Sequence, residues 1–235
     1  MRSKYSYKEV MHFVDLTCLK DPDEIKKEDI DALVAEAELY KVAAICVWPE
    51  FLDWIPVECT IQKATVVNFP MGDQPVEDVQ QMIDDIMEKH PGTEIDYVFP
   101  YQQYWQGDKS MAVQHCQTII EHCAEHEVKL KIILETGVIQ NIVHLQTLAS
   151  QLIDLGAKML KTSTGKTPIG ATPEAVKALC VTMHNHIHEC GIKISGGISN
   201  YSEVLEYLDL ILTIINEKPS PDWLRFGCSQ LFNDL

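Results

Sequence analysis

The sequence predicts one α/β domain, residues 1–235, folded as a single closed (β/α)8 barrel. Eight short apolar runs occur along the chain, and segments with helical spacing of apolar residues separate most of them. Strands that are separated by helices pair in parallel through right-handed crossovers. The count of eight favours a closed barrel over a doubly wound open sheet, which is the alternative fold.

The predicted strands are short apolar runs, and several of them end at a proline or a glycine. They span residues 12–17, 43–48, 64–69, 94–99, 129–135, 157–163, 192–195 and 224–227.

The predicted helices place apolar residues three and four positions apart, which gives each helix one buried face. Thr172 and Pro173 suit the cap and the first turn of one of them. An irregular, proline-containing link follows the second strand, and the last helix is truncated. The first predicted helix begins near residue 23, and another begins at residue 172. The others span 75–89, 110–126, 141–155 and 201–216, and a stub at 229–235 could start the last one.

The chain carries a formal charge of −16, from 35 acidic residues and 19 lysines and arginines. Such a balance argues against nucleic acid or an anionic membrane as a partner, because both favour basic surfaces. A small anionic metabolite remains possible as a ligand, since its binding site needs only local cations and backbone N–H groups.

Eight cysteines are scattered without a Cys-x-x-Cys pair, so we read them as free thiols in a reducing compartment. The N-terminus lacks the apolar core of a signal peptide. The apolar run at 204–215 is too short to span a bilayer and includes Glu206 and Asp209. We therefore expect a cytoplasmic protein.

The sixth strand and its loop hold the first candidate for chemistry. Lys161 shares a strand face with Met159, and burying its charge is costly. Burial, or a second cation nearby, would lower the lysine pKa and expose a neutral amine, the form that attacks carbonyl groups. The hydroxyls, glycine and cation of residues 163–166 suit an anion such as phosphate. The alternative is a snorkelling lysine followed by a simple turn.

Active sites of such barrels lie at the C-terminal ends of the strands. Under that rule, Lys161, Lys193 and Asp96 lie together at this end of the barrel. Asp15 and Thr17 of the first strand join them there. Two lysines on strands about 4.8 Å apart would not both stay charged cheaply. One becomes a neutral nucleophile, while the other stays cationic or shares a proton with Asp96. This arrangement predicts Schiff-base chemistry.

The chain resembles the deoxyribose-phosphate aldolases, which are class I (Schiff-base) aldolases with a (β/α)8 fold. The resemblance runs nearly end to end, in order and at barrel-strand positions. The matching motifs are Asp15-Leu16-Thr17, Ala43-Ala44-Ile45-Cys46, Asn68-Phe69-Pro70-x-Gly72, Asp96-x-Val98-Phe99-Pro100-Tyr101, Leu130-Lys131-x-Ile133-x-Glu135-Thr136-Gly137, Lys161-Thr162-Ser163-Thr164-Gly165-Lys166, Gly196-Gly197 and Arg225-Phe226-Gly227.

The resemblance implies reversible cleavage of 2-deoxy-D-ribose 5-phosphate to acetaldehyde and D-glyceraldehyde 3-phosphate, in deoxyribonucleoside catabolism. It assigns imine formation to Lys161, the lowering of the Lys161 pKa to Lys193, and the acid/base step to Asp96. The reaction uses no metal or cofactor. A homodimer is an expectation from family habit. The implied substrate-binding residues are Asp15, Thr17, Cys46, Lys131 and Thr164, and the implied phosphate-binding residues are Gly165, Lys166, Gly196, Gly197, Gly227 and Ser229.

Three departures from the family pattern stand out. Ile194-Ser195 replaces the usual proline and alanine, and Cys228-Ser229 replaces a frequent pair of serines. The chain also stops at Leu235 without the C-terminal tyrosine that some members use for proton transfer. We expect water or Asp96 to take that role, at some cost in rate.

Several residues have competing interpretations. Lys131 either supports the site or pairs with Glu135. His184, His186 and His188 resemble a metal tract, but their two-residue spacing suits a strand, not the predicted helix end. His122 and His126 form half of a zinc site that no neighbouring acid-plus-histidine pattern completes. We therefore predict no metal site.

Two other classes of function stay open. One is a sugar-phosphate isomerase or epimerase on the same barrel, which needs a carboxylate or histidine base but no imine. The other is a catalytically impaired protein that binds a phosphosugar, suggested by the truncated end. Trapping of an imine with borohydride separates the aldolase from both.

Overall fold

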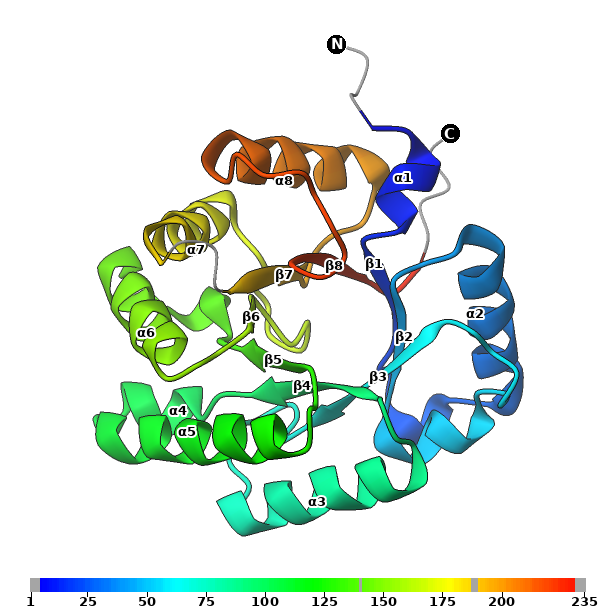
Figure 1. Ribbon diagram of the computed structural model, residues 1–235, viewed down its shortest axis with the longest axis horizontal. Helices are drawn as coiled ribbons and strands as arrows, with labels where there is room; N and C mark the ends of the chain where they lie inside the picture. Colours follow the sequence, from blue (N-terminus) through cyan, green and yellow to red (C-terminus); the bar gives the residue numbers. More distant parts are fainter. Residues whose placement is uncertain (1–4, 140, 187–189, 231–235) are drawn as a thin grey trace.

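The computed structural model describes residues 5–139, 141–186 and 190–230, and its centre is a closed TIM barrel of eight parallel strands. Each strand pairs with the next in sequence, and β8 pairs with β1 (Figure 1). The predicted closed (β/α)8 barrel is therefore confirmed. The strands are β1 (Val14–Cys18), β2 (Ala44–Val47), β3 (Gln62–Val67), β4 (Glu94–Val98), β5 (Leu130–Ile133), β6 (Met159–Lys161), β7 (Gly191–Ser195) and β8 (Leu224–Cys228).

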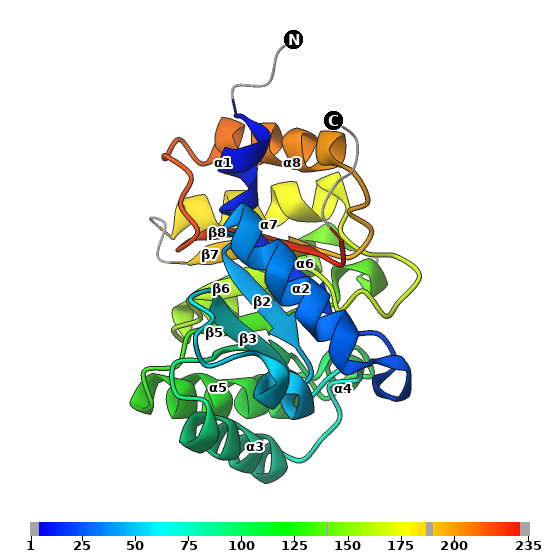
Figure 2. The same cartoon turned by 90° about the vertical axis from the view of Figure 1, so that its right-hand side faces the viewer.

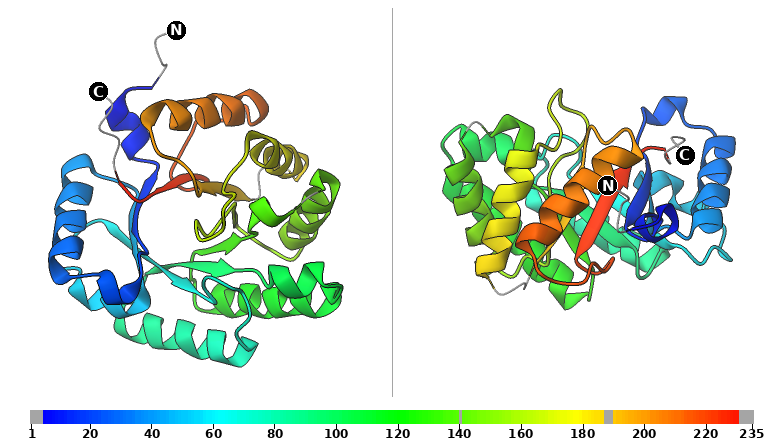
Figure 3. Two further views of the ribbon diagram at one scale, coloured as in Figure 1. Left: turned by 180° about the vertical axis from the view of Figure 1, so that it is seen from behind. Right: turned by 90° about the horizontal axis from the view of Figure 1, so that it is seen from above.

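Helices form a ring around this barrel, as both ends of the molecule show (Figures 1 and 3). Figure 2 shows α2 running across the outer face of β2. A 3-10 helix, Pro49–Trp54, follows β2, which confirms the predicted irregular link. The helices are α1 (Tyr7–Met11), α2 (Lys27–Tyr40), α3 (Val76–Lys89), α4 (Tyr101–Trp105), α5 (Lys109–Glu125), α6 (Ile142–Asp154), α7 (Pro173–Asn185) and α8 (Tyr201–Ile214).

The strand boundaries differ from the prediction by at most two residues at either end. β3 ends at Val67 because Asn68 takes a left-handed conformation with φ of 55°. β5 ends at Ile133, and Glu135 behind it has φ of 51°. Both turns lie at the C-terminal mouth of the barrel and carry polar side chains. The last predicted helix falls largely on residues 231–235, which lie outside the described residues.

The first long helix begins at Lys27, four residues later than predicted. The Asp21 side chain accepts a hydrogen bond from the Asp23 N–H and caps a separate 3-10 turn, so the chain stays extended until Lys26. The sequence prediction also missed α4 and α1. A capping box between Ser6 and Glu9 starts α1, and its Ser-x-x-Glu spacing is readable from the sequence.

Apolar side chains fill the layer between the strands and the helices. None of the helices built from described residues is long and apolar enough to cross a bilayer. A second, smaller apolar cluster contains Ala44, Cys46 and Ala64 of β2 and β3. These small side chains leave the opposite half of the barrel interior free for long, charged ones.

Candidate active site

Seven charged side chains meet inside the barrel, although a charge in an apolar core is normally excluded. All of them are at least 95% buried. Because side chains alternate between the two faces of a strand, positions in register across neighbouring strands point the same way, as Lys161, Lys193 and Arg225 do. The seven are Asp15 of β1, Glu94 and Asp96 of β4, Lys131 of β5, Lys161 of β6, Lys193 of β7 and Arg225 of β8.

Asp96 is the centre of this cluster. Its Oδ1 accepts a hydrogen bond from Lys131 Nζ at 2.8 Å, and its Oδ2 accepts from Lys161 Nζ at 2.7 Å and Lys193 Nζ at 2.8 Å. Burial opposes ionisation of the carboxyl more than any other single effect. The three lysines together outweigh it and hold the Asp96 pKa well below its usual value. Asp96 is therefore a carboxylate.

Asp15, Glu94 and Arg225 form the deeper part of the cluster. Asp15 accepts hydrogen bonds from Lys193 Nζ at 2.5 Å and from the Arg225 guanidinium at 2.6 Å. Glu94 accepts from the Arg225 guanidinium at 2.9 Å and lies 2.7 Å from Lys131 Nζ. The sequence prediction assigned no role to Glu94 and listed Arg225 only within a motif. Arg225 pairs with Asp15, and Glu94 pairs with Lys131, so each of the two contacts a residue that was predicted for the site.

The three lysines differ in how many carboxylates surround them. Lys131 lies within 3.5 Å of Asp15, Glu94 and Asp96, whereas Lys193 contacts two carboxylates and Lys161 contacts Asp96.

The pKa values follow this order. Burial is the largest effect for each lysine and lowers its pKa, but the carboxylates outweigh burial at Lys131 and Lys193 and raise their pKa. At Lys161, burial and the neighbouring charge of Lys193 exceed the attraction of Asp96, so its pKa falls below the usual value. Lys161 is thus the lysine that most readily becomes a neutral amine.

Lys161 also lies at the bottom of a cavity of about 420 Å³ at the C-terminal mouth of the barrel. The remaining clustered residues do not line this cavity. Its walls come from α2 and from the ends of β1, β6, β7 and β8 with the loops that follow them. The predicted residues that line it are Thr17, Lys161, Thr164, Gly165, Lys166, Gly196, Gly197, Gly227 and Ser229.

Glycines bring the backbone close to this cavity. Gly196 and Gly197 have φ of 84° and 87°, which side chains rarely tolerate. A Cβ on Gly170 would lie 2.2 Å from the Gly196 carbonyl oxygen, so the loop after β6 packs directly on the loop after β7. At Gly227, a Cβ would lie 3.3 Å from Cε of Lys193. Gly227 therefore leaves room for the Lys193 side chain.

Glu135 holds the loop after β6 and was missed as a functional candidate. It is fully buried and accepts hydrogen bonds from the Thr164 hydroxyl, from the Thr164 N–H at 3.3 Å and from the Thr167 hydroxyl at 3.1 Å. Thr164 Oγ1 in turn accepts from the Lys166 N–H at 3.0 Å. Among the described residues, the ion-pair partners of Lys131 are Asp15, Glu94 and Asp96, and not Glu135.

Cys46 is fully buried beside the cluster and is not among the residues that line the cavity. Burial, reinforced by the charge of Asp96, raises its pKa to about 11, so the thiol stays protonated at neutral pH. Of the predicted histidine tract, His188 lies outside the described residues. His186 Nδ1 lies 2.8 Å from the Thr182 carbonyl oxygen at the end of α7.

Comparison with known proteins shows what the whole chain is similar to. The family model for DeoC/LacD family aldolases matches residues 9–211. A curated deoxyribose-phosphate aldolase from Agrobacterium fabrum is 33% identical over 236 residues, which cover 96% of this chain and 88% of that protein.

Solved structures share the fold at lower identity. The aldolase QR15 has a TM-score of 0.79 at 22% identity, covering 94% of this chain and 91% of its own. A putative deoxyribose-phosphate aldolase from Toxoplasma gondii has a TM-score of 0.84 at 19% identity, covering 94% and 89%. A tetrameric deoxyribose phosphate aldolase from Aeropyrum pernix has a TM-score of 0.78 at 22% identity, covering 95% and 88%.

Removing one carboxylate from the deep part of the cluster should destabilise the fold. We expect Glu94→Gln to lower the free energy of unfolding by roughly 3 kcal/mol, because Arg225 and Lys131 then remain buried with one charged partner fewer. Denaturant unfolding measures this. The matched control is Asp31→Asn, which breaks an exposed ion pair with Lys27 and should cost less than about 1 kcal/mol. Equal, small losses in both variants would contradict the prediction.

Proposed function

The chain belongs to the DeoC/LacD aldolase family, and on that premise we propose that it cleaves 2-deoxy-D-ribose 5-phosphate reversibly to acetaldehyde and D-glyceraldehyde 3-phosphate. The observation that carries the proposal is the position of Lys161. It is the clustered lysine that lines the cavity, and it is the one whose pKa is lowered. The related enzyme from Agrobacterium fabrum supports the choice of substrate.

The proposed reaction begins when neutral Lys161 Nζ attacks the aldehyde carbon of the open-chain sugar. Loss of water gives a protonated imine, which withdraws electrons from the neighbouring carbon. A base removes the proton of the C3 hydroxyl, the C2–C3 bond breaks as C3 becomes a carbonyl carbon, and the electron pair of that bond forms an enamine on the lysine. Glyceraldehyde 3-phosphate leaves. Protonation of the enamine carbon and hydrolysis of the imine then release acetaldehyde and regenerate the amine.

Asp96 and Lys193 are the proposed proton carriers. Asp96 Oδ2 accepts hydrogen bonds from both Lys161 and Lys193, so a proton can pass between the two amines through one oxygen or through water beside it. The raised pKa of Lys193 keeps it cationic beside Lys161. Lys131 and Asp15 hold this pair from below, and Thr17 and Thr164 are proposed to contact the sugar.

The phosphate is proposed to bind opposite Lys161, where the loops after β6, β7 and β8 meet. Gly165, Gly196 and Gly197, all with positive φ, can turn backbone N–H groups toward an anion. Lys166 supplies the cation, and its ammonium donates to the Leu19 carbonyl oxygen at the edge of the same cavity. Gly227 and Ser229 complete the proposed phosphate-binding wall.

The compartment and assembly remain proposals. Eight free cysteines support the expected reducing compartment, the cytoplasm. The Aeropyrum pernix relative is a tetramer, and the homodimer expected for this chain stays a prediction.

Borohydride trapping with acetaldehyde tests the proposed chemistry directly. We expect intact mass and peptide mapping to find one adduct, on Lys161, and the Lys161→Ala variant to lose both the adduct and sugar cleavage. Lys158→Ala is the matched control, because Lys158 precedes the same strand and is exposed. A folded wild-type protein that forms no adduct would sink the aldolase proposal and favour an isomerase or a binding protein.

The pH dependence of trapping tests the role of Lys193. Trapping needs the neutral amine, so its rate should rise with pH through the lowered pKa of Lys161, below the usual lysine value of 10.5. Lys193→Met removes a neighbouring positive charge, and the pKa of Lys161 should then rise. The acid limb of the profile should therefore move to higher pH. A limb that stays in place or moves to lower pH would show that Lys193 does not tune Lys161.

Phosphate recognition by Lys166 predicts a change confined to phosphorylated substrate. A charge-assisted hydrogen bond contributes about 1.5–3 kcal/mol, so Lys166→Ala should lower kcat/KM for 2-deoxyribose 5-phosphate by roughly 10- to 100-fold. The value for unphosphorylated 2-deoxyribose should change little. Equal losses for both sugars would instead assign Lys166 a structural role, through its contact with Leu19.

A further inference from the structure

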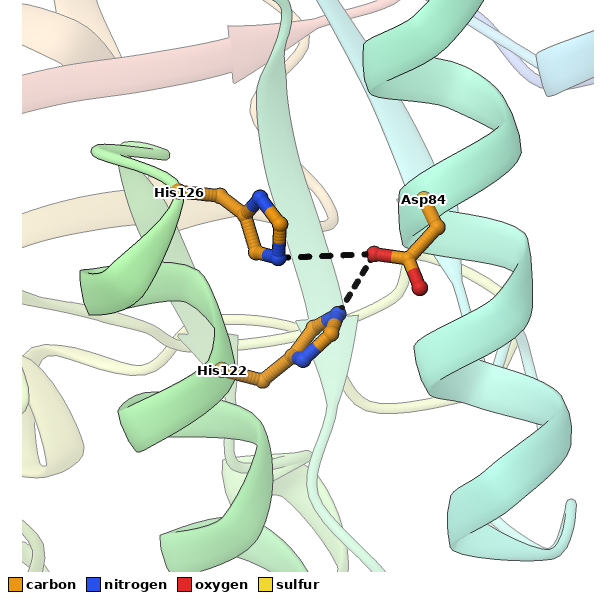
Figure 4. A group of neighbouring side chains, drawn as sticks. All are labelled: Asp84, His122 and His126. Carbon is orange, nitrogen blue, oxygen red and sulfur yellow. Dashed lines mark hydrogen bonds and ion pairs between the residues drawn. The ribbon is translucent and has the colours of Figure 1, made fainter.

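A second group of titratable side chains lies on the outside of the barrel, where α3 packs against α5 (Figure 4). Asp84 comes from α3, His122 comes from the last turn of α5, and His126 is the residue that caps the C-terminus of α5. Within the described residues, this is the one group of three His, Cys, Asp or Glu side chains whose ligand atoms all lie within 4.8 Å of one another. We propose that these three side chains bind a divalent transition-metal ion of the zinc class.

The ligand types and their spacing suit such an ion. His122 and His126 are four residues apart at the C-terminal end of α5, and their ring centroids are 4.8 Å apart. His122 Nε2 lies 2.8 Å from Asp84 Oδ1, and His126 Nε2 lies 3.6 Å from the same oxygen. Ligand atoms of a tetrahedral zinc ion, with bonds near 2.1 Å, are about 3.4 Å apart. Small side-chain rotations therefore bring all three atoms to bonding distance of one ion.

The surroundings supply the rest of a metal site. The Asp84 and His126 side chains are 43% and 46% exposed, so water can reach the open side and take a fourth position. The Gln80 amide lies 3.5 Å from His122 Nδ1, the ring nitrogen that would not bind the metal. With its oxygen turned toward the ring, this amide accepts the Nδ1–H and fixes the tautomer that leaves Nε2 free for an ion.

The same contacts also fit a simpler arrangement, in which Asp84 accepts a hydrogen bond from His122, forms an ion pair with His126 and joins α3 to α5. The metal proposal differs in a measurable way. An ion that binds the native fold and not the unfolded chain stabilises the protein in proportion to its concentration. Because the group lies on the outer helices, away from the cavity that Lys161 lines, metal binding is independent of the proposed aldolase activity.

Titration with Zn2+ and Co2+ tests the proposal on the full chain with its thiols reduced. We expect one equivalent of each ion to bind, with a visible d–d spectrum typical of four-coordinate Co2+. Zn2+ should raise the thermal midpoint. His126→Ala, an exposed change at the end of α5, should weaken binding at least about tenfold and abolish the thermal shift.

His90→Ala is the matched control, because His90 contacts one acid, Asp53, at 3.2 Å, and this change should leave binding unaltered. Asp84→Asn should behave like His126→Ala. Equal binding by wild type and His126→Ala would overturn the proposal, as would a thiolate-to-cobalt band, which would place the ion on a cysteine. Borohydride trapping on Lys161 should be the same in all these variants, so either proposal can fail without the other.

Discussion

The structure depends on the balance of charge inside the barrel. Three carboxylates and four bases are buried together, so full ionisation leaves one excess positive charge, four minus three. Each uncompensated charge in such a place costs several kcal/mol. Releasing a proton from one base restores neutrality, and the contacts select Lys161 for that role. The lowered pKa of Lys161 follows first from its burial and then from the charge of Lys193, which together exceed the attraction of Asp96.

Barrel geometry makes this set attainable. Neighbouring strands place residues of the same register on the same side, so side chains from β4 to β8 and β1 reach a common interior. Opposite them, β2 and β3 contribute Ala44, Cys46 and Ala64, whose small volume accommodates the long lysine and arginine chains. Buried ion pairs of this kind are weak sources of net stability, and their use is to fix one arrangement of the site.

Much of the fold and of the candidate site could be predicted because the sequence patterns that indicate them lie within single strands and helices. Strand and helix spacing predicted the barrel, and Lys161 and Lys193 lie directly opposite each other on adjacent strands. Glu94 and Arg225 could not be paired in advance, because their contact crosses the barrel and depends on the stagger of all eight strands. Glu135 was considered only as a partner of Lys131, because its actual partners follow a different strand. Asp84, 38 residues before His122, meets it only through the packing of two outer helices.

The position of Lys161 follows from a gradient along the barrel axis. Deep in the interior, Lys131 lies among three carboxylates, and nearer the mouth Lys193 contacts two and Lys161 one. The proton affinity of the amines therefore decreases toward the cavity. A neutral amine is favoured at the lysine that lines the cavity, while Lys131 and Lys193, which do not line it, stay charged next to the carboxylates that neutralise them. The same arrangement that permits burial of the charges thus places Lys161, the proposed nucleophile, at the mouth.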